Sequence, residues 1–159
     1  MTVRVSFDLD DTLICQSLTP TEPPLPSWRR WRHPEPLRLG AASLIRGLRT
    51  RDCSVWVYTT SFRSPASIRG RLRAHGTPVD AVVNQDRHDR VVGRSGPSKY
   101  PPAFGIDLHV DDLPGVATEG ARHGFEVLIV ALDDPDWYRS VLKAVDKWIL
   151  TRGASFGPI

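Results

Sequence analysis

A short apolar segment that ends in carboxylates constrains this chain most. Apolar residues at positions 3, 5, 7 and 9 are typical of a buried strand. Asp8 and Asp10 fall at the end of that strand, and their spacing of two puts both carboxylates on one side of an extended chain. Carboxylates held this close repel each other unless a cation or a shared proton relieves them. The segment therefore predicts a charged site at a strand terminus.

The rest of the chain alternates between predicted helices and strands. Helices are predicted over 37–50, 64–75, 114–123 and 134–149, and further strands over 54–61, 79–83, 105–112 and 126–132. Such alternation is typical of a parallel sheet with helices on both faces. We therefore predict one α/β domain over 1–159, a Rossmann-like three-layer sandwich with a central parallel sheet of about five strands.

Two segments are predicted to be irregular loops beside this sheet. Residues 14–36 are rich in proline, which blocks helices and central strands, and 84–98 are polar and basic. Positions 28–33 of the first loop read WRRWRH, with arginines at 29, 30 and 32. Two interpretations of this sequence stay open. It is either a substrate-binding surface of guanidinium and indole groups, or a pair of core-packed tryptophans with solvated arginines.

Composition indicates an ordinary soluble globular protein. The chain of 159 residues is 40% hydrophobic and 25% charged. Its two cysteines provide no disulfide framework, and we see neither a basic-then-apolar leader nor an apolar run of ~18 residues. We therefore predict a cytoplasmic protein without membrane contact. The net charge of +3 comes mostly from arginine, which suits phosphate recognition, but a genome-wide bias gives the same count.

Three predicted strands end in groups that bind metal or phosphate: Asp8 and Asp10, Thr59 and Thr60, and Asp111 and Asp112. The carboxyl ends of parallel strands meet at one edge of a sheet, where ligands of such folds bind. Each acidic pair alone is also typical of turns and helix caps. Four carboxylates together form a site of hard oxygen ligands, which suits Mg²⁺.

In order and spacing, these motifs resemble those of the haloacid dehalogenase (HAD) superfamily. Residues 7–13 (FDLDDTL) are similar to its first motif, an apolar strand followed by Asp-x-Asp-x-Thr. Residues 57–59 resemble the second motif, Lys99 the third, and 110–112 the acidic fourth. The agreement covers residues 3 to about 116.

The resemblance implies a Mg²⁺-dependent phosphomonoesterase that forms an aspartyl-phosphate. Asp8 would be the nucleophile, and Asp10 would protonate the leaving group and then activate water. Mg²⁺ would be held by Asp8, the backbone carbonyl of Asp10 and Asp112, with Asp111 close by or acting through water.

The same resemblance implies a phosphate clamp. Thr59 and the Thr60 N–H would hold a phosphate oxygen, and Lys99 would neutralise nucleophile and phosphate together. Arg90 or Arg94 is the alternative cation.

Neither loop is long enough to fold as the cap domain that many HAD phosphatases carry. Capless members often act on macromolecular phosphates or let another subunit close the site. The resemblance therefore implies a bulky substrate, such as a phosphorylated protein or a nucleic-acid end, ahead of a small metabolite, and allows a homo-oligomer. Arg29, Arg30 and Arg32 would then face the substrate.

Two other classes of protein stay open. A phospho-acceptor module resembling a response-regulator receiver also combines Mg²⁺, Asp, Thr and Lys, but its acidic pair follows the first strand and its acceptor the third. Here the acidic pair Asp111–Asp112 comes late in the chain. A non-catalytic phosphate-binding protein on the same fold is the other alternative.

Overall fold

A parallel sheet of five strands forms the centre of the computed structural model, which describes residues 2–16 and 19–154. The strand order is β3-β2-β1-β4-β5. The strands are β1 (Arg4–Phe7), β2 (Ser54–Tyr58), β3 (Ala81–Val83), β4 (Leu108–Asp111) and β5 (Val127–Ile129). In the central pairings Val5 lies opposite Val55 on one side and Leu108 on the other. The predicted α/β class and five-stranded parallel sheet are confirmed.

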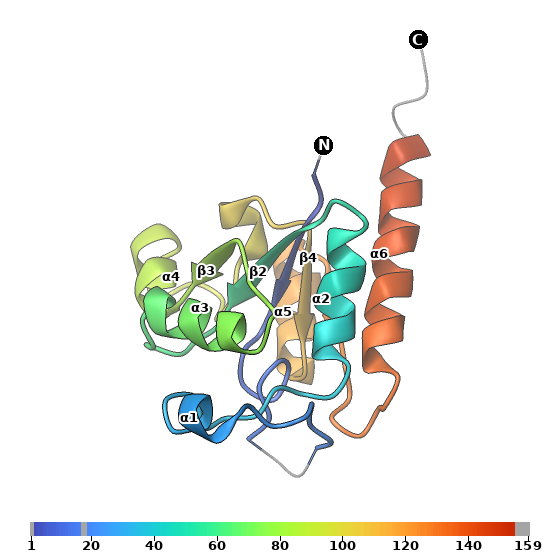
Figure 1. Ribbon diagram of the computed structural model, residues 1–159. Coiled ribbons are helices and arrows are strands. Elements are labelled where there is room, and N and C mark those ends of the chain that lie inside the picture. Colours follow the sequence, from blue (N-terminus) through green and yellow to red (C-terminus); the bar gives the residue numbers. More distant parts are fainter. Residues whose placement is uncertain (1, 17–18, 155–159) are drawn as a thin grey trace.

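Helices cover both faces of this sheet, as Figure 1 shows. On one face lie α2 (Ala41–Arg49) and α3 (Pro65–Ala74), and α6 (Trp137–Ala154) packs against α2. On the other face lies α5 (Pro114–His123). Right-handed crossovers produce this distribution, because the chain moves outward in one direction from β1 to β3 and in the opposite direction from β4 to β5. The predicted three layers are therefore present.

The main core lies between the sheet and the layer of α2 and α6. Val5, Phe7 and Val57 of the sheet are each 0% exposed, as are Leu44 of α2 and Val141 of α6. Each such side chain contributes roughly 1.5–3 kcal/mol relative to an exposed one. This burial fixes β1 and β2, the strands whose ends carry the predicted nucleophile and phosphate clamp.

The second helix begins later than predicted. The sequence pattern indicates a helix over 37–50, whereas α2 starts at Ala41. Gly40 has φ 89° and ends the non-helical segment before it, and a Cβ there would collide with the ring of Tyr138. Leu37 forms an isolated bridge with Ile14, so the chain before Gly40 is extended.

The two predicted loops contain short helices. In the first is α1 (Ser27–Arg30), and in the second is α4 (Gln85–Val91), so the prediction of an irregular chain over 84–98 was wrong. The sequence of α4, QDRHDRV, lacks the apolar stripe that signals an amphipathic helix. Its formation depends instead on Asn84, whose Oδ1 accepts the N–H of Arg87 at 3.1 Å. A 3₁₀ turn, η1 (Pro101–Phe104), leads into β4.

Two predicted ends also shift. Helix α6 extends to Ala154, beyond the predicted end at 149, and β5 covers only three residues of the predicted strand 126–132. All three residues of β5 are only half-buried, because this strand lies at the edge of the sheet. Within the described residues, no helix is both long and apolar enough to cross a membrane.

Candidate active site

Strand β1 delivers Asp8 to the middle of the sheet edge. The Asp8 N–H donates to the carbonyl of Val110 at 2.9 Å, which continues the pairing with β4. The chain then turns sharply, since Asp11 has φ 59° and the Ile14 N–H returns to the Leu9 carbonyl at 2.9 Å. Burial raises the pKa of Asp8 to about 6, partly offset by Lys99. Asp8 therefore lies where a buried carboxylate needs a cation.

Lys99 is that cation. Its Nζ lies 2.6 Å from Asp8 Oδ1 and 2.5 Å from Asp111 Oδ2, and its side chain is 3% exposed. Burying an ammonium group this deeply is unfavourable unless carboxylates pair with it. The alternative cations lie elsewhere, since Arg94 pairs with Asp89 at 3.0 Å and Arg90 donates to the carbonyl of Asp86. The third predicted motif thus meets the first and the fourth.

Asp111, the last residue of β4, has protein partners on both carboxylate oxygens. Its Oδ2 accepts from Lys99 and from His109 Nε2 at 3.0 Å, and its Oδ1 accepts the Leu113 N–H at 2.9 Å. Burial opposes ionisation of Asp111, but the His109 and Lys99 contacts dominate and hold its pKa at about 2. Asp111 is therefore a carboxylate that orients Lys99.

His109 supports Asp111 from inside the sheet. Burial lowers the pKa of His109 to about 4, so the ring is neutral near pH 7. Because a carboxylate only accepts, Nε2–H donates to Asp111, and Nδ1 accepts the Ser6 hydroxyl at 2.8 Å. The sequence analysis missed this contact. The signal was available, because a histidine inside an otherwise apolar strand needs a buried partner.

Asp112 is connected to the first motif through Thr12. The Thr12 hydroxyl donates to Asp112 Oδ1 at 2.9 Å, and burial raises the pKa of Asp112. Across residues 2–16 and 19–154, no cluster of three or more His, Cys, Asp or Glu side chains is arranged to hold a metal ion. A metal at this edge would therefore need backbone carbonyl, water or substrate oxygens beside the side-chain carboxylates.

Thr59 and Thr60, which are predicted to bind phosphate, follow the end of β2. Thr59 is buried, its N–H donates to the carbonyl of Val83 at 2.9 Å, and its Oγ1 accepts the Ser61 N–H at 3.1 Å. Thr60 is exposed and follows at the rim. Since β2 lies beside β1, the two threonines follow the strand next to Asp8.

Asp10 is held by an arginine that the sequence analysis missed. Arg63 Nη1 donates to both carboxylate oxygens of Asp10, at 2.7 and 3.0 Å, and Nη2 donates to Glu35 at 3.0 Å. Arg71 of α3 pairs with the same Glu35, and the Gln16 amide also contacts Asp10. These contacts join residues up to 53 positions apart, so no local pattern signals them.

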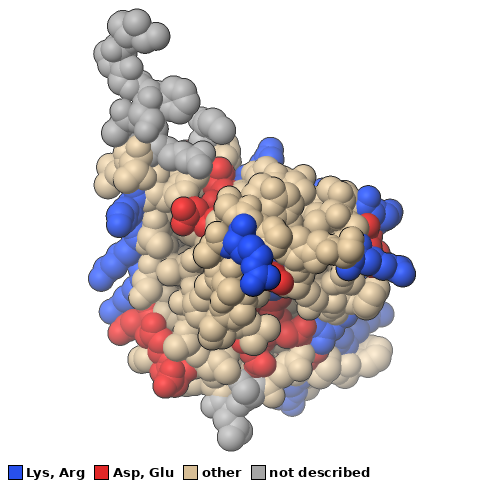
Figure 2. Space-filling model, turned by 180° about the vertical axis from the view of Figure 1, so that it is seen from behind, with Lys and Arg blue, Asp and Glu red and all other residues tan. Residues whose placement is uncertain are grey.

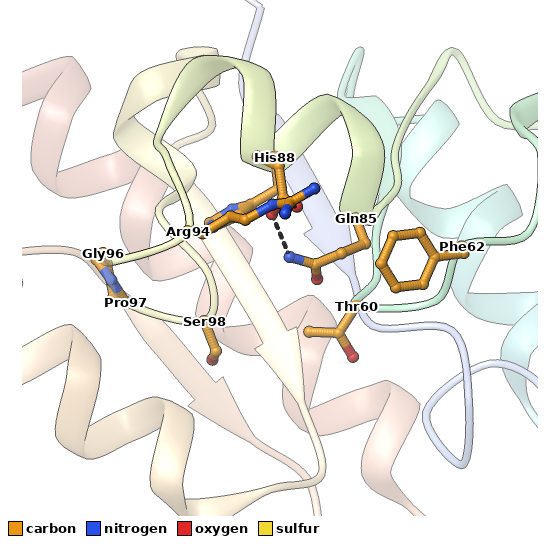
Figure 3. Close-up of a pocket in the computed structure, with 9 residues that line it drawn as sticks. Thr60, Phe62, Gln85, His88, Arg94, Gly96, Pro97 and Ser98 are labelled. Atoms are coloured by element: carbon orange, nitrogen blue, oxygen red, sulfur yellow. Dashed lines mark hydrogen bonds and ion pairs between the residues drawn. The ribbon is translucent and has the colours of Figure 1, made fainter.

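A cavity of about 460 Å³ opens beside Thr60, and Figure 3 shows its lining. The Phe62 ring faces it next to Thr60, and the Gln85 amide donates to Asp89 at 2.6 Å. Its opposite wall ends at Ser98, the residue before Lys99. The cavity therefore adjoins the groups predicted to hold a phosphate.

The predicted substrate-facing arginines lie on a separate surface. Trp28 and Trp31 are 65% and 75% exposed, so the interpretation that both pack on the core is wrong. The Arg29 guanidinium lies 4.6 Å from the Trp28 ring centroid, and that of Arg32 lies 5.6 Å from the Trp31 centroid. With His33 and Ala74 these four side chains line a hollow of about 390 Å³, and Arg30 is exposed beside it.

Charge is unevenly distributed over the surface. Seen from behind in Figure 2, acidic side chains gather in the lower half, toward the carboxyl ends of the strands. Lysine and arginine side chains line both sides of this view. The acidic end of the molecule is the end at which Asp8, Asp10 and the Asp111–Asp112 pair are placed.

The strand order and the crossovers define an α/β protein with a doubly wound parallel sheet. The carboxylate and hydroxyl side chains at the strand ends place a candidate site at the carboxyl edge of that sheet. No protein-family model matches the chain, and no curated protein matches it. Among solved structures it is similar to a chain of the Pnkp1/Rnl/Hen1 RNA repair complex, with a TM-score of 0.51 and 13% identity. The likeness covers 82% of this chain and 43% of the other. At this identity it supports the fold alone.

Proposed function

We propose that the protein is a Mg²⁺-dependent phosphomonoesterase of the HAD type, with Asp8 as its nucleophile. The observation that carries the proposal is the buried contact of Lys99 with Asp8 and Asp111, at the sheet edge where Thr59 follows β2. A carboxylate after β1, a hydroxyl after β2 and a cation from the segment before η1 are the parts that phosphoryl transfer requires.

The chemistry begins at Asp8. Its carboxylate would attack the phosphorus, forming an aspartyl-phosphate as the bond to the leaving oxygen breaks. The charge of Lys99 would reduce repulsion between the carboxylate and the incoming phosphate, at 2.6 Å from Asp8. Thr59 and the Thr60 N–H would orient a non-bridging oxygen. Water would then hydrolyse the intermediate and release phosphate.

Asp10 is assigned the proton transfers. A group that protonates the leaving oxygen must contact it, whereas both carboxylate oxygens of Asp10 accept from Arg63 Nη1. We therefore include in the proposal that Asp10 exchanges Arg63 for the leaving group when a phosphate binds. Arg63 is also held by Glu35, so its guanidinium keeps a partner during this exchange.

The metal would be held by Asp8, the Asp10 backbone carbonyl and Asp112. This donor set fits Mg²⁺, because it is all oxygen and both carboxylates keep lone pairs beyond their bonds to Lys99 and Thr12. Asp111 accepts three bonds from the protein, so we assign it to orienting Lys99 instead. When bound, the ion would offset charge on the transferring phosphoryl group.

Phosphate release by the purified protein with Mg²⁺ tests the proposal. The panel is p-nitrophenyl phosphate, phosphopeptides, 5′- and 3′-phosphorylated oligonucleotides and phosphorylated metabolites. Asp8→Asn is expected to lose activity by on the order of 10³-fold or more, while Asp133→Asn, the same change on an exposed loop, keeps it. Equal activity of Asp8→Asn would remove the nucleophile assignment. A phosphoprotein that persists for hours after acetyl phosphate treatment would indicate a phospho-acceptor, and no release from any substrate would reject the enzyme.

A further inference from the structure

We propose that residues 28–33, together with the adjoining end of α3, bind single-stranded nucleic acid and present a phosphorylated strand end to the Asp8 site. The delivery step rests on the proposed function. The binding step does not, and it is argued from the exposed side chains of this basic–aromatic surface.

The first argument is the exposure of two indoles on one turn. Trp28 and Trp31 are three residues apart, and the helical conformation continues through Trp31, so their side chains leave the same side of the chain. Both are well over half exposed. Large aromatic groups exposed together on a soluble surface mark an interaction site, because water contact with that much apolar area is unfavourable.

The second argument is the local charge. Residues 23–34 contain three arginines and no acidic residue, and α3 contributes the exposed Arg69 and Arg73, again without an acid. The two segments are in contact, since Arg29 Nη1 reaches the Ala74 carbonyl at 3.5 Å. The nearest acid along the chain, Glu35, is engaged by Arg63 and Arg71. The surface is therefore positive although the whole chain carries only +3.

The third argument is the pairing of each indole with a guanidinium. Arg29 over Trp28 and Arg32 over Trp31 form two similar units, each a flat ring beside a positive charge. A single strand presents the complementary pattern, with a base to stack and a phosphate to neutralise in each nucleotide. The hollow of about 390 Å³ between these units is in the range of small-ligand sites.

A nucleic acid fits this surface better than the other anionic partners. A phosphopeptide offers one phosphate and no regular series of rings. An interfacial membrane helix needs a long apolar face, whereas α1 has four residues and contains one indole, that of Trp28, next to arginines. Two repeated ring-and-charge units favour a polymer with the same repeat.

Continuous contacts connect this surface with the candidate active site. Glu35 follows His33 by two residues and accepts from Arg63, which in turn holds both oxygens of Asp10. The loop that carries the two tryptophans is therefore anchored to the residue assigned to the leaving group. A strand bound along it would have its end directed to the edge of the sheet.

Binding measured without catalysis tests the inference. Labelled single-stranded DNA and RNA of about 12 nucleotides are titrated with the Asp8→Asn protein, and anisotropy is recorded at several salt concentrations. Trp28→Ala/Trp31→Ala is expected to weaken binding by roughly 10-fold or more. Arg29→Gln/Arg30→Gln/Arg32→Gln is expected to reduce the slope of log K against log salt by about 2. The DNA and RNA arms identify the preferred strand.

Matched controls use exposed arginines on other elements. Arg46→Gln/Arg139→Gln removes two such charges from α2 and α6 and is expected to leave binding unchanged. All residues changed on top of Asp8→Asn are exposed, so circular dichroism is expected to show the same fold as the Asp8→Asn protein. The inference would be overturned if both surface variants bound as tightly as the parent protein or if no binding occurred at low salt. Tighter binding to a phosphopeptide or to phosphatidylserine vesicles would also overturn it. If the wild-type protein binds oligonucleotides but releases phosphate from no substrate of the panel, only the proposed function is rejected. If it releases phosphate from p-nitrophenyl phosphate but not from a bound phosphorylated oligonucleotide, the delivery step is rejected.

Discussion

Lys99 carries its charge inside the protein, where the Asp8 and Asp111 carboxylates surround it. Removing that charge in Lys99→Met would leave two buried carboxylates facing each other. We expect the free energy of unfolding to fall by about 3–5 kcal/mol near pH 7, measured by urea denaturation. Lys143→Met, on the exposed side of α6, is expected to change it by less than about 0.5 kcal/mol.

A double variant distinguishes lost charge balance from lost packing at this position. In Lys99→Met/Asp8→Asn one of the two facing charges is also removed, so part of the lost stability is expected to return. A Lys99→Met protein as stable as wild type, or a double variant less stable than the single one, would contradict the role of Lys99 as the buried counter-ion.

The role of Asp10 leads to an expectation about leaving groups. If Asp10 protonates the leaving oxygen, Asp10→Asn is expected to reduce kcat/KM for alkyl phosphates by about 10²–10⁴-fold. The loss is expected to be at least about ten times smaller for p-nitrophenyl phosphate, because its leaving group departs without a proton. Asp8→Asn is expected to affect both substrates alike. An equal loss for both substrates in Asp10→Asn would remove the acid assignment.

Asp80, at the start of the chain into β3, provides a pH-dependent contribution to stability away from the site. Its Oδ2 accepts from Arg49 at 2.6 Å, Ser54 at 2.9 Å and the Val55 N–H at 2.7 Å. Burial alone would raise its pKa, but these bonds prevail and lower it. The carboxylate therefore stabilises the fold above its ordinary pKa of about 3.9, and that contribution is lost as the pH falls through the lower folded value.

The corresponding comparison uses Asp80→Asn. Wild type is expected to be more stable than the variant near pH 7, and the difference is expected to shrink as the pH is lowered below about 4. Urea unfolding followed at several pH values measures it. A difference that stays constant or grows with acidity would show that the hydrogen bonds favour the neutral carboxyl instead.

At the residue scale, the sequence was sufficient to predict which polar side chains lie at the carboxyl edge of the sheet, wherever such a side chain directly follows a predicted strand. Asp8, Thr59 and Asp111 were predictable because parallel strands bring their carboxyl ends to one edge. Arg63 and His109 were not identified as site residues. The ion pair between Arg63 and Asp10 depends on the conformation of the connection between β2 and α3. Hydrophobic periodicity does not predict that conformation.

At the scale of elements, hydrophobic periodicity located helices with a buried face and failed for α4. That helix buries only His88, whose Nδ1 is hydrogen-bonded to the Tyr58 hydroxyl at 2.6 Å. Its formation therefore depends on tertiary contacts and on its N-cap rather than on an apolar stripe. Similarly, α2 was placed too early because the pattern continues through Leu37 while Gly40 turns the backbone.

The cap of α4 can be compared directly with that of α3. Asn84 accepts the Arg87 N–H and also donates from Nδ2 to the Arg63 carbonyl at 3.2 Å, while Ser64 makes a single bond, to the Ser67 N–H at 3.2 Å. We expect Asn84→Ala to lower the free energy of unfolding by about 2 kcal/mol and Ser64→Ala by about 1 kcal/mol. Thermal and urea denaturation measure both, and equal losses would show that the Arg63 contact contributes nothing.

At the scale of the whole molecule, strand order was predictable only as a class. Alternating elements imply a parallel sheet, but the reversal that places β1 between β2 and β4 depends on the direction of each crossover. That reversal brings Asp8 beside both Thr59 and Asp111. The topology therefore determines which strand ends are neighbours at the candidate site. The sequence motifs determine which chemical groups stand at those ends.

The whole chain is expected to unfold as one cooperative unit, because its last helix completes the core of the first strands. Val141 and Val145 of α6 belong to the same buried cluster as Val5 and Leu44. Arg51 binds Asp146 through Nε at 2.6 Å and Nη2 at 2.9 Å, and a Cβ on Gly47 would lie 3.0 Å from both methyl groups of Leu142. Helix α6 cannot leave without exposing this cluster to water.

Two probes test that cooperativity in one urea titration. Far-ultraviolet circular dichroism reports on all helices. The change in tryptophan fluorescence on unfolding comes mainly from buried residues such as Trp137, which is 1% exposed. We expect coincident transitions with a single midpoint. Gly47→Val, which forces α2 and α6 apart, is expected to move both transitions to lower urea together, by about 1–3 kcal/mol of stability. If α6 were an independent addition, the variant would split the transitions and leave the midpoint of the sheet where it was.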